Sequence, residues 1–178
     1  SLTLGDDNGT LSLTTAQVGL VYGTLGVAAL TVGGIAGGWA ISRHGLRRWL
    51  WPMILAVHVP NLAFVYLAWT MPANLAVIAA AIVVEQFGYG FGFAAYLLYM
   101  ILVADGPHKT AHYALCTGFM ALGMMLPGMA SGWIQQQLGY PAFFVWVCVA
   151  TLPSMGVAAF LRIPPGFGRR APDGTRPA

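Results

Sequence analysis

Long apolar stretches dominate the chain and are separated by short polar connections. Five of the stretches are long enough for a helix of roughly 20 residues, the length that crosses about 30 Å of hydrocarbon. They cover residues 16–41, 49–70, 74–103, 112–137 and 141–162. Strands of a membrane barrel would be about ten residues long and would alternate polar and apolar positions, unlike these stretches. The pattern therefore predicts an all-α membrane protein with about five transmembrane helices.

The same pattern divides the chain into three parts. Residues 14–163 form the predicted transmembrane helical half-domain, and residues 1–13 form a loop before it. Residues 164–178 carry too few apolar side chains to bury a core, which predicts a disordered tail. Basic residues follow the first, third and fifth spans and are missing from the opposite side. Because cytoplasmic loops are enriched in Lys and Arg, we expect a periplasmic initial loop and a cytoplasmic carboxy terminus.

Composition supports the membrane class. Hydrophobic residues make up 58% of the 178 residues and charged residues only 7%, against roughly 25% charged residues in a soluble domain. We expect the lipid bilayer to be a partner of the chain, and we expect no binding to nucleic acid. Cys116 and Cys148 lie in apolar stretches as small core residues. His108 and His112 have no third ligand nearby, so neither a metal nor another cofactor is expected.

Glycines are concentrated on one side of the first span. At 3.6 residues per turn they occupy about a third of the helix circumference. They are Gly19, Gly23, Gly26, Gly33, Gly34 and Gly37. Small residues allow two helix backbones to approach closely in lipid, so this face predicts a helix–helix seam.

The third span carries a polar stripe. Its members are Glu85, Tyr89, Tyr96 and Tyr99, with Gln86 beside the acid. A charged group near the bilayer centre costs at least ~2.5 kcal/mol, so Glu85 should be paired, hydrated or protonated. It either carries a proton in coupled transport or hydrogen-bonds a neighbouring helix as a permanently protonated acid. The tyrosines either contact a polar solute or sugar ring, or simply pack against other helices.

Two further observations bear on function. His58, near Pro60 and Asn61, either lines a path through the membrane or is satisfied by packing partners. No Ser-His-Asp or Cys-His arrangement can be defended from spacing, so an enzyme is not the expected class.

The connection after the first span contains a recognisable motif. Its positions are Gly38, Arg43, Gly45, Arg47 and Arg48. It resembles the loop signature of the major facilitator superfamily, in which an acidic residue also occurs. Ser42 stands at that acidic position here, so a charge relay through this loop is not implied.

Longer stretches narrow the resemblance. The segments VVEQFGYGFGFAAYLLYMILV and HKTAHYALCTGFMALGMMLPGMASGWIQQQLGYPAFF resemble AmpG-type muropeptide permeases and their acetyl-CoA-transporting relatives. The resemblance implies that the five spans correspond to helices 8–12 of a twelve-helix fold, with the seventh helix and the amino-terminal half absent from this chain. It also implies that the first, third and fourth spans border a central cavity.

The resemblance implies a fragment of a secondary active transporter working by alternating access. The expected activity is proton-coupled uptake of muropeptide-like sugar-peptides across the bacterial inner membrane. Its partners would be a small-molecule solute, protons and the missing amino-terminal half. One alternative is a permease for another solute, such as a sugar, a drug or an acyl-CoA-type metabolite. A membrane-embedded enzyme subunit is the less favoured alternative.

Overall fold

The computed structural model describes residues 19–70 and 74–170. Within these ranges, five helical segments are long and apolar enough to cross a membrane. They are Val21–His44, Leu46–Thr70, Ala76–Val103, Lys109–Gly139 and Pro141–Ala159. The prediction of an all-α membrane protein with about five transmembrane helices is therefore confirmed. The predicted loop at 1–13 and the predicted helix start at residue 16 lie outside the described residues.

The spans are assembled from six helical elements. The first span joins a short π-helix, η1 (Val21–Gly26), to α2 (Val27–His44). The second span consists of α3 (Leu46–His58) and α4 (Asn61–Thr70), and the third is α5 (Leu75–Val103). The fourth and fifth spans both belong to α6 (Lys109–Ala159), which reverses direction within its length.

Pro60 explains the break between α3 and α4. Proline has no N–H, so the carbonyl of Ala56, four residues earlier, loses its usual helical donor. Gly88 of α5 lies directly against this carbonyl and against the Pro60 ring. A Cα–H group in that position gives the carbonyl a weak hydrogen-bonding partner away from water. The break in the second span is thus covered by the glycine of a neighbouring helix.

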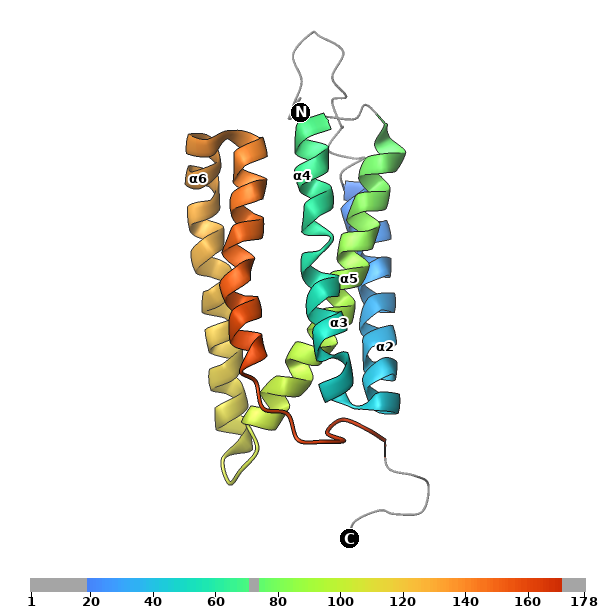
Figure 1. Cartoon of the computed structure of the whole chain (residues 1–178), viewed down its shortest axis with the longest axis vertical. Helices are drawn as coiled ribbons and strands as arrows, with labels where there is room; N and C mark the ends of the chain where they lie inside the picture. The colour runs from blue at the N-terminus through green and yellow to red at the C-terminus, as the bar shows by residue number, and fades with distance from the viewer. Residues whose placement is uncertain (1–18, 71–73, 171–178) are drawn as a thin grey trace.

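Gly139 explains the reversal of α6. Its backbone has φ 72° and ψ 164°, a conformation that residues with a Cβ rarely adopt. The two arms of α6 consequently run side by side in opposite directions, as Figure 1 shows. The second arm contacts α4 through Phe144, whose ring stacks on that of Phe64 at a centroid distance of 5.9 Å.

The closest helix packing lies between α2 and α5. Gly33 and Gly37 of α2 contact the backbone carbonyls of Phe87 and Phe91 so closely that a Cβ on either glycine would overlap them. Gly90 of α5 lies equally close to α2, where a Cβ would overlap a backbone carbonyl. Each helix therefore places glycine against the backbone of the other, which maximises dispersion contacts in lipid.

The remaining glycines of the first span differ from one another. A Cβ on Gly26 would lie 3.4 Å from the Gln86 side chain, and one on Gly34 would lie 3.8 Å from the Gly90 carbonyl oxygen. Both distances are ordinary van der Waals contacts. A Cβ on Gly19 or Gly23 would meet no other atom of residues 19–70 and 74–170 within 4 Å. The seam between the first span and α5 thus runs from Gly26, the last residue of η1, to Gly37 of α2.

The other side of α5 packs on α3. Gly92 lies against the carbonyl of Met53 and the side chain of Val57, and Gly88 lies one turn earlier on the same side. Gly88 and Gly92 therefore pack against the second span, whereas Gly90, between them in the sequence, packs against α2. These contacts place α5 between α2 and α3, as in Figure 1.

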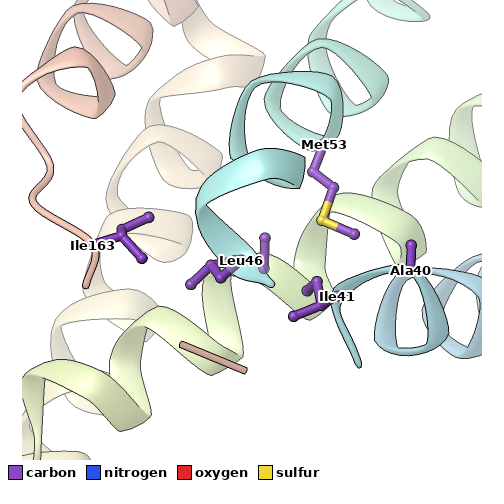
Figure 2. Close-up of a cluster of buried hydrophobic side chains, with 6 residues drawn as sticks. Ala40, Ile41, Leu46, Met53 and Ile163 are labelled. Carbon is purple, nitrogen blue, oxygen red and sulfur yellow. The ribbon is translucent and has the colours of Figure 1, made fainter. Parts of the chain in front are cut away.

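One end of the bundle gathers three connections. The turn between α2 and α3, the loop between α5 and α6, and the segment after α6 all lie at this end in Figure 1. A buried apolar cluster lies beneath them, and Figure 2 shows how its members converge from separate elements. Its buried members are Ala40, Ile41, Leu46, Met53, Ala95 and Ile163. Leu46 and Met53 are completely inaccessible to solvent.

Residues 164–170, which we call the C-terminal strap, are attached to this end. The backbone N–H of Leu46 donates a hydrogen bond of 2.8 Å to the carbonyl of Phe167. The N–H of Arg170 donates one of 2.8 Å to the carbonyl of Ser42. These backbone hydrogen bonds hold residues 164–170, which belong to the predicted disordered tail, on this end of the bundle, and the Phe167 side chain packs against the buried cluster. Residues 171–178 lie outside the described residues.

Candidate functional site

The polar stripe of α5 carries a continuous aromatic surface. The ring of Tyr89 stacks on that of Phe93 at 5.6 Å, and Phe93 stacks on Tyr96 at 6.0 Å. The i, i+3 and i, i+4 spacing of a helix brings these rings into register along one face. The tyrosine hydroxyls make this surface amphipathic, able both to cover an apolar ring and to hydrogen-bond a polar group.

This surface forms one wall of a cavity of about 450 Å³. The other walls come from α3 and from the end of the second arm of α6. The residues that line it and carry polar atoms in their side chains are His58, Tyr89, Tyr96, Tyr99 and Ser154. The remaining lining is apolar. A cavity of this volume with a few polar groups is typical of a small-molecule site.

The structure therefore brings together three of the five candidate cavity residues and leaves two apart. Tyr89, Tyr96 and Tyr99 line the cavity, whereas Glu85 and Gln86 do not. The second, third and fifth spans form its walls. The resemblance implies a central cavity bordered by the first, third and fourth spans, so only α5 is shared between the two descriptions.

His58, for which the sequence left open a path-lining role and a packing role, lies in the cavity wall. It is the last residue of α3, immediately before the break at Pro60. Its Nδ1 atom is buried and has no hydrogen-bond partner among the described residues. A buried polar atom without a partner is costly, so this nitrogen is suited to meet a ligand or a water. The nearby Pro60 and Asn61 were the available sequence signal, since they indicate a broken helix at this depth.

Glu85 lies farther along α5, beside the first span. Its half-buried carboxyl forms no ion pair with any residue in 19–70 or 74–170. Tyr22 of η1 lies near enough to Glu85 for an electrostatic interaction between the two side chains. Gln86 lies against Gly26 with its Cγ and its amide nitrogen. The acid therefore lies near a tyrosine and forms no ion pair with a described basic residue.

The loop signature lies at the end of the bundle, away from the cavity. Gly45 links α2 to α3 with φ 84°, in the left-handed region that favours glycine. Arg43, Arg47 and Arg48 are exposed, as is Gly38. The guanidinium of Arg43 lies 4.5 Å from the ring centroid of Trp39.

The loop between α5 and α6 contains an exposed ion pair. Lys109 Nζ lies 2.6 Å from Asp105 Oδ1. The hydrogen bond from Lys109, and then its positive charge, hold the pKa of the Asp105 carboxyl below its ordinary value. Nearby, the rings of His108 and His112 are arranged edge to face, with their centroids 6.4 Å apart. No group of three metal-ligating side chains occurs in the part of the chain that the structure describes.

Comparison with known proteins adds a second line of observation. No family model matches the chain, and no solved structure does. The anhydromuropeptide permease of Escherichia coli strain K12 is 26% identical over 139 residues, which cover 78% of this chain and 28% of the permease. A Rickettsia felis protein named "Putative transporter AmpG 4" is 23% identical over 151 residues, covering 85% of this chain and 36% of its own length. A Rickettsia prowazekii protein named "Putative transporter AmpG 2" is 20% identical over 151 residues, which cover 85% of this chain and 37% of that protein.

The chain therefore spans about a third of the length of these relatives. Their names describe permeases or transporters. Together with the five membrane-crossing helices, these similarities confirm the resemblance to AmpG-type permeases over most of the chain.

Proposed function

We propose that this chain supplies five helices of a proton-coupled permease that takes up muropeptide-like sugar-peptides across the bacterial inner membrane. The observation that carries the proposal is the similarity of 78% of the chain to an anhydromuropeptide permease. The aromatic face of α5 supports it, because tyrosine rings can cover the apolar face of a sugar while their hydroxyls bind its oxygens.

Glu85 is the proposed proton carrier. Its carboxyl is half-buried in a membrane span without a basic partner among the described residues. An intramembrane acid in this situation is most stable when protonated, and it releases its proton when water or a solute reaches it. Coupling would follow if solute binding near Tyr89, one turn away, changed the access of water to Glu85.

The proposal includes partners that this chain does not contain. The relatives are roughly three times as long as the aligned region, so we propose that further helices complete the transporter. Alternating access requires two parts that rock about a site near the bilayer midplane. The 178 residues alone should therefore show no transport in proteoliposomes.

The decisive experiment uses the complete polypeptide reconstituted in proteoliposomes. Labelled anhydromuropeptide should accumulate when a pH gradient is imposed and should not accumulate when an uncoupler collapses it. Excess unlabelled anhydromuropeptide should compete, whereas a neutral sugar or acetyl-CoA should not. Competition by acetyl-CoA or a sugar alone would reassign the cargo to that solute, and gradient-independent equilibration would replace coupled transport with facilitated diffusion.

Orientation can be tested separately. We propose that the end carrying the α2–α3 turn and the strap faces the cytoplasm, because basic residues collect there. Cys116 and Cys148 are first replaced by alanine, and a single cysteine is introduced at Arg47. A membrane-impermeant maleimide should label it in inside-out vesicles and not in intact cells. A cysteine at Asn74, at the other end of the bundle, serves as the reciprocal control.

A further inference from the structure

The C-terminal strap brings together arginines that are far apart in the sequence. Its hydrogen bonds attach Phe167 to Leu46 and Arg170 to Ser42, each at 2.8 Å. Gly168, with φ 79°, packs so tightly against Ile41 and Leu98 that a side chain there would collide with them. The strap is therefore fixed across the α2–α3 turn.

The consequence is a concentrated positive surface. Arg43, Arg47 and Arg48 are exposed around the turn, and the strap carries exposed Arg169, whose neighbour Arg170 is hydrogen-bonded through its backbone to Ser42. We call these four residues the arginine patch. Like charges brought together repel one another unless an anion lies between them.

The described carboxylates do not supply that anion. They are Glu85, which lies inside a span, and Asp105, which pairs with Lys109 at 2.6 Å. No ion pair to the arginine patch occurs within residues 19–70 and 74–170. The counter-ion must then come from a part of the chain outside those ranges or from another molecule.

Two tryptophans indicate which kind of molecule fits. Trp39 precedes Arg43 by one turn of α2 and is 57% exposed, and Trp51 follows Arg47 by one turn of α3 and is 44% exposed. Since both helices end at the same turn, each tryptophan lies one turn deeper along the span than its arginine. Exposed tryptophan at the end of a membrane span is typical of the headgroup level of a bilayer, with basic residues just beyond it.

We propose that the arginine patch binds the phosphate headgroup of an anionic phospholipid, whose upper acyl region lies against Trp39 and Trp51. Guanidinium groups bind phosphate through paired N–H donors. A zwitterionic headgroup neutralises the charge of the arginine patch only in part. The strap acts in this site by holding Arg169 next to the turn. Such a lipid would remain bound whether or not the protein transports a solute.

The test uses the complete chain in micelles that contain equal amounts of phosphatidylglycerol and phosphatidylcholine. Native mass spectrometry counts the lipids retained by the protein. Phosphatidylglycerol adducts should exceed phosphatidylcholine adducts, and high salt in the preparation should reduce the excess. Equal retention of the two lipids by the unaltered chain would overturn the proposal without any variant.

Variants locate the site. The double change Arg47→Gln with Arg48→Gln should reduce the preference for phosphatidylglycerol at least about fivefold. A single basic residue near an anionic surface already contributes a factor of about five. The control, Lys109→Gln with Arg162→Gln, removes the same charge outside the patch and should keep the preference. Equal losses in both variants would mean that overall charge, and no defined site, attracts the lipid. Circular dichroism confirms that each variant retains its helices.

Two further arms separate other sources of the anion. Inorganic phosphate and glycerol 3-phosphate, added at the lipid's concentration, should leave the lipid adducts unchanged. Displacement by either compound would identify a site for free phosphate instead of lipid. Asp173 follows the strap in the sequence and is the alternative internal partner. Asp173→Asn should leave the preference unchanged, and a preference that appears only in this variant would show that the chain neutralises its own arginines.

Discussion

The α-carbon of Gly33 lies directly on the backbone carbonyl of Phe87, at a separation that leaves no room for a Cβ. This contact joins the first and third spans, and Gly37 repeats it one turn later against Phe91. Helix backbones approach this closely in lipid only where one of them has no side chain.

Replacing Gly33 with alanine should therefore separate the two helices. The expected loss is about 1–3 kcal/mol of stability, the usual effect of overpacking a close contact. Thermal unfolding in detergent, followed by circular dichroism, measures it. Gly38→Ala is the matched control, because a Cβ at Gly38 meets nothing within 4 Å. Equal unfolding temperatures for the two variants would mean that the seam does not hold the bundle together.

Glu85→Gln tests the proposed proton carrier in the complete transporter. The amide keeps the size and hydrogen-bonding capacity of the acid but cannot exchange a proton. Uptake driven by a pH gradient should fall to the background level, whereas exchange of solute across the membrane without a gradient should continue. Asp105→Asn removes an exposed carboxyl outside the spans and should change neither rate. Full gradient-driven uptake by the Gln variant would reduce Glu85 to a structural hydrogen-bonding residue.

His58 is predicted to bind solute through Nδ1, the buried nitrogen without a described partner. His58→Phe removes that atom and should raise the KM for uptake about tenfold, equivalent to one lost hydrogen bond of about 1.4 kcal/mol. His58→Asn places a polar atom near the same position and should recover most of the affinity. The same KM in all three proteins would show that the nitrogen faces only water.

Gly139→Ala should weaken the reversal between the arms of α6. Its φ of 72° and ψ of 164° are nearly exclusive to glycine, so the substitution should cost about 1–3 kcal/mol. Limited proteolysis near residue 139 and the thermal midpoint both report the effect. Gly132→Ala lies in a regular helix with free space around it and should have little consequence. If both variants unfold at the same temperature, the surrounding structure absorbs the strain that alanine introduces at position 139.

The Asp105–Lys109 pair makes a prediction about pH. Lys109 lowers the pKa of Asp105 in the folded protein. The ion pair therefore contributes its full stability above the pKa that Asp105 has in the unfolded chain. That contribution is lost as the pH falls through the folded pKa. Lys109→Gln should move the titration of Asp105 to higher pH, measured by NMR of the labelled carboxyl carbon and assigned with Asp105→Asn. Arg162→Gln removes the same charge elsewhere and should leave this titration in place.

The spans were predictable from the sequence because each is a long apolar run with few charges. The position of Gly33 and Gly37 on a contacting face followed from helical periodicity. Periodicity does not specify how far along the helix the neighbour extends. The same pattern therefore includes Gly19 and Gly23, which make no such contact with the part of the chain that the structure describes. The same limitation applies to Glu85, which shares a face with Tyr89 but lies beyond the end of the cavity.

The strap and His58 could not be predicted for different reasons. The strap is held by backbone hydrogen bonds to Ser42 and Leu46 and by the close packing of Gly168, and neither can be read from composition. A single histidine in an apolar run says nothing about its partners until the helices around it are placed. Only the assembled bundle reveals that one nitrogen of His58 is left without a hydrogen bond among the described residues.

The hydrogen bond from Leu46 to Phe167 also has a meaning for biosynthesis. The N–H of Leu46 is synthesised before the carbonyl that accepts its hydrogen bond, because Phe167 follows all five described spans in the chain. Until then the turn must be solvated or held by another protein. A chain that ended before Phe167 would leave this peptide group without its partner and the apolar cluster beneath it without the Phe167 side chain.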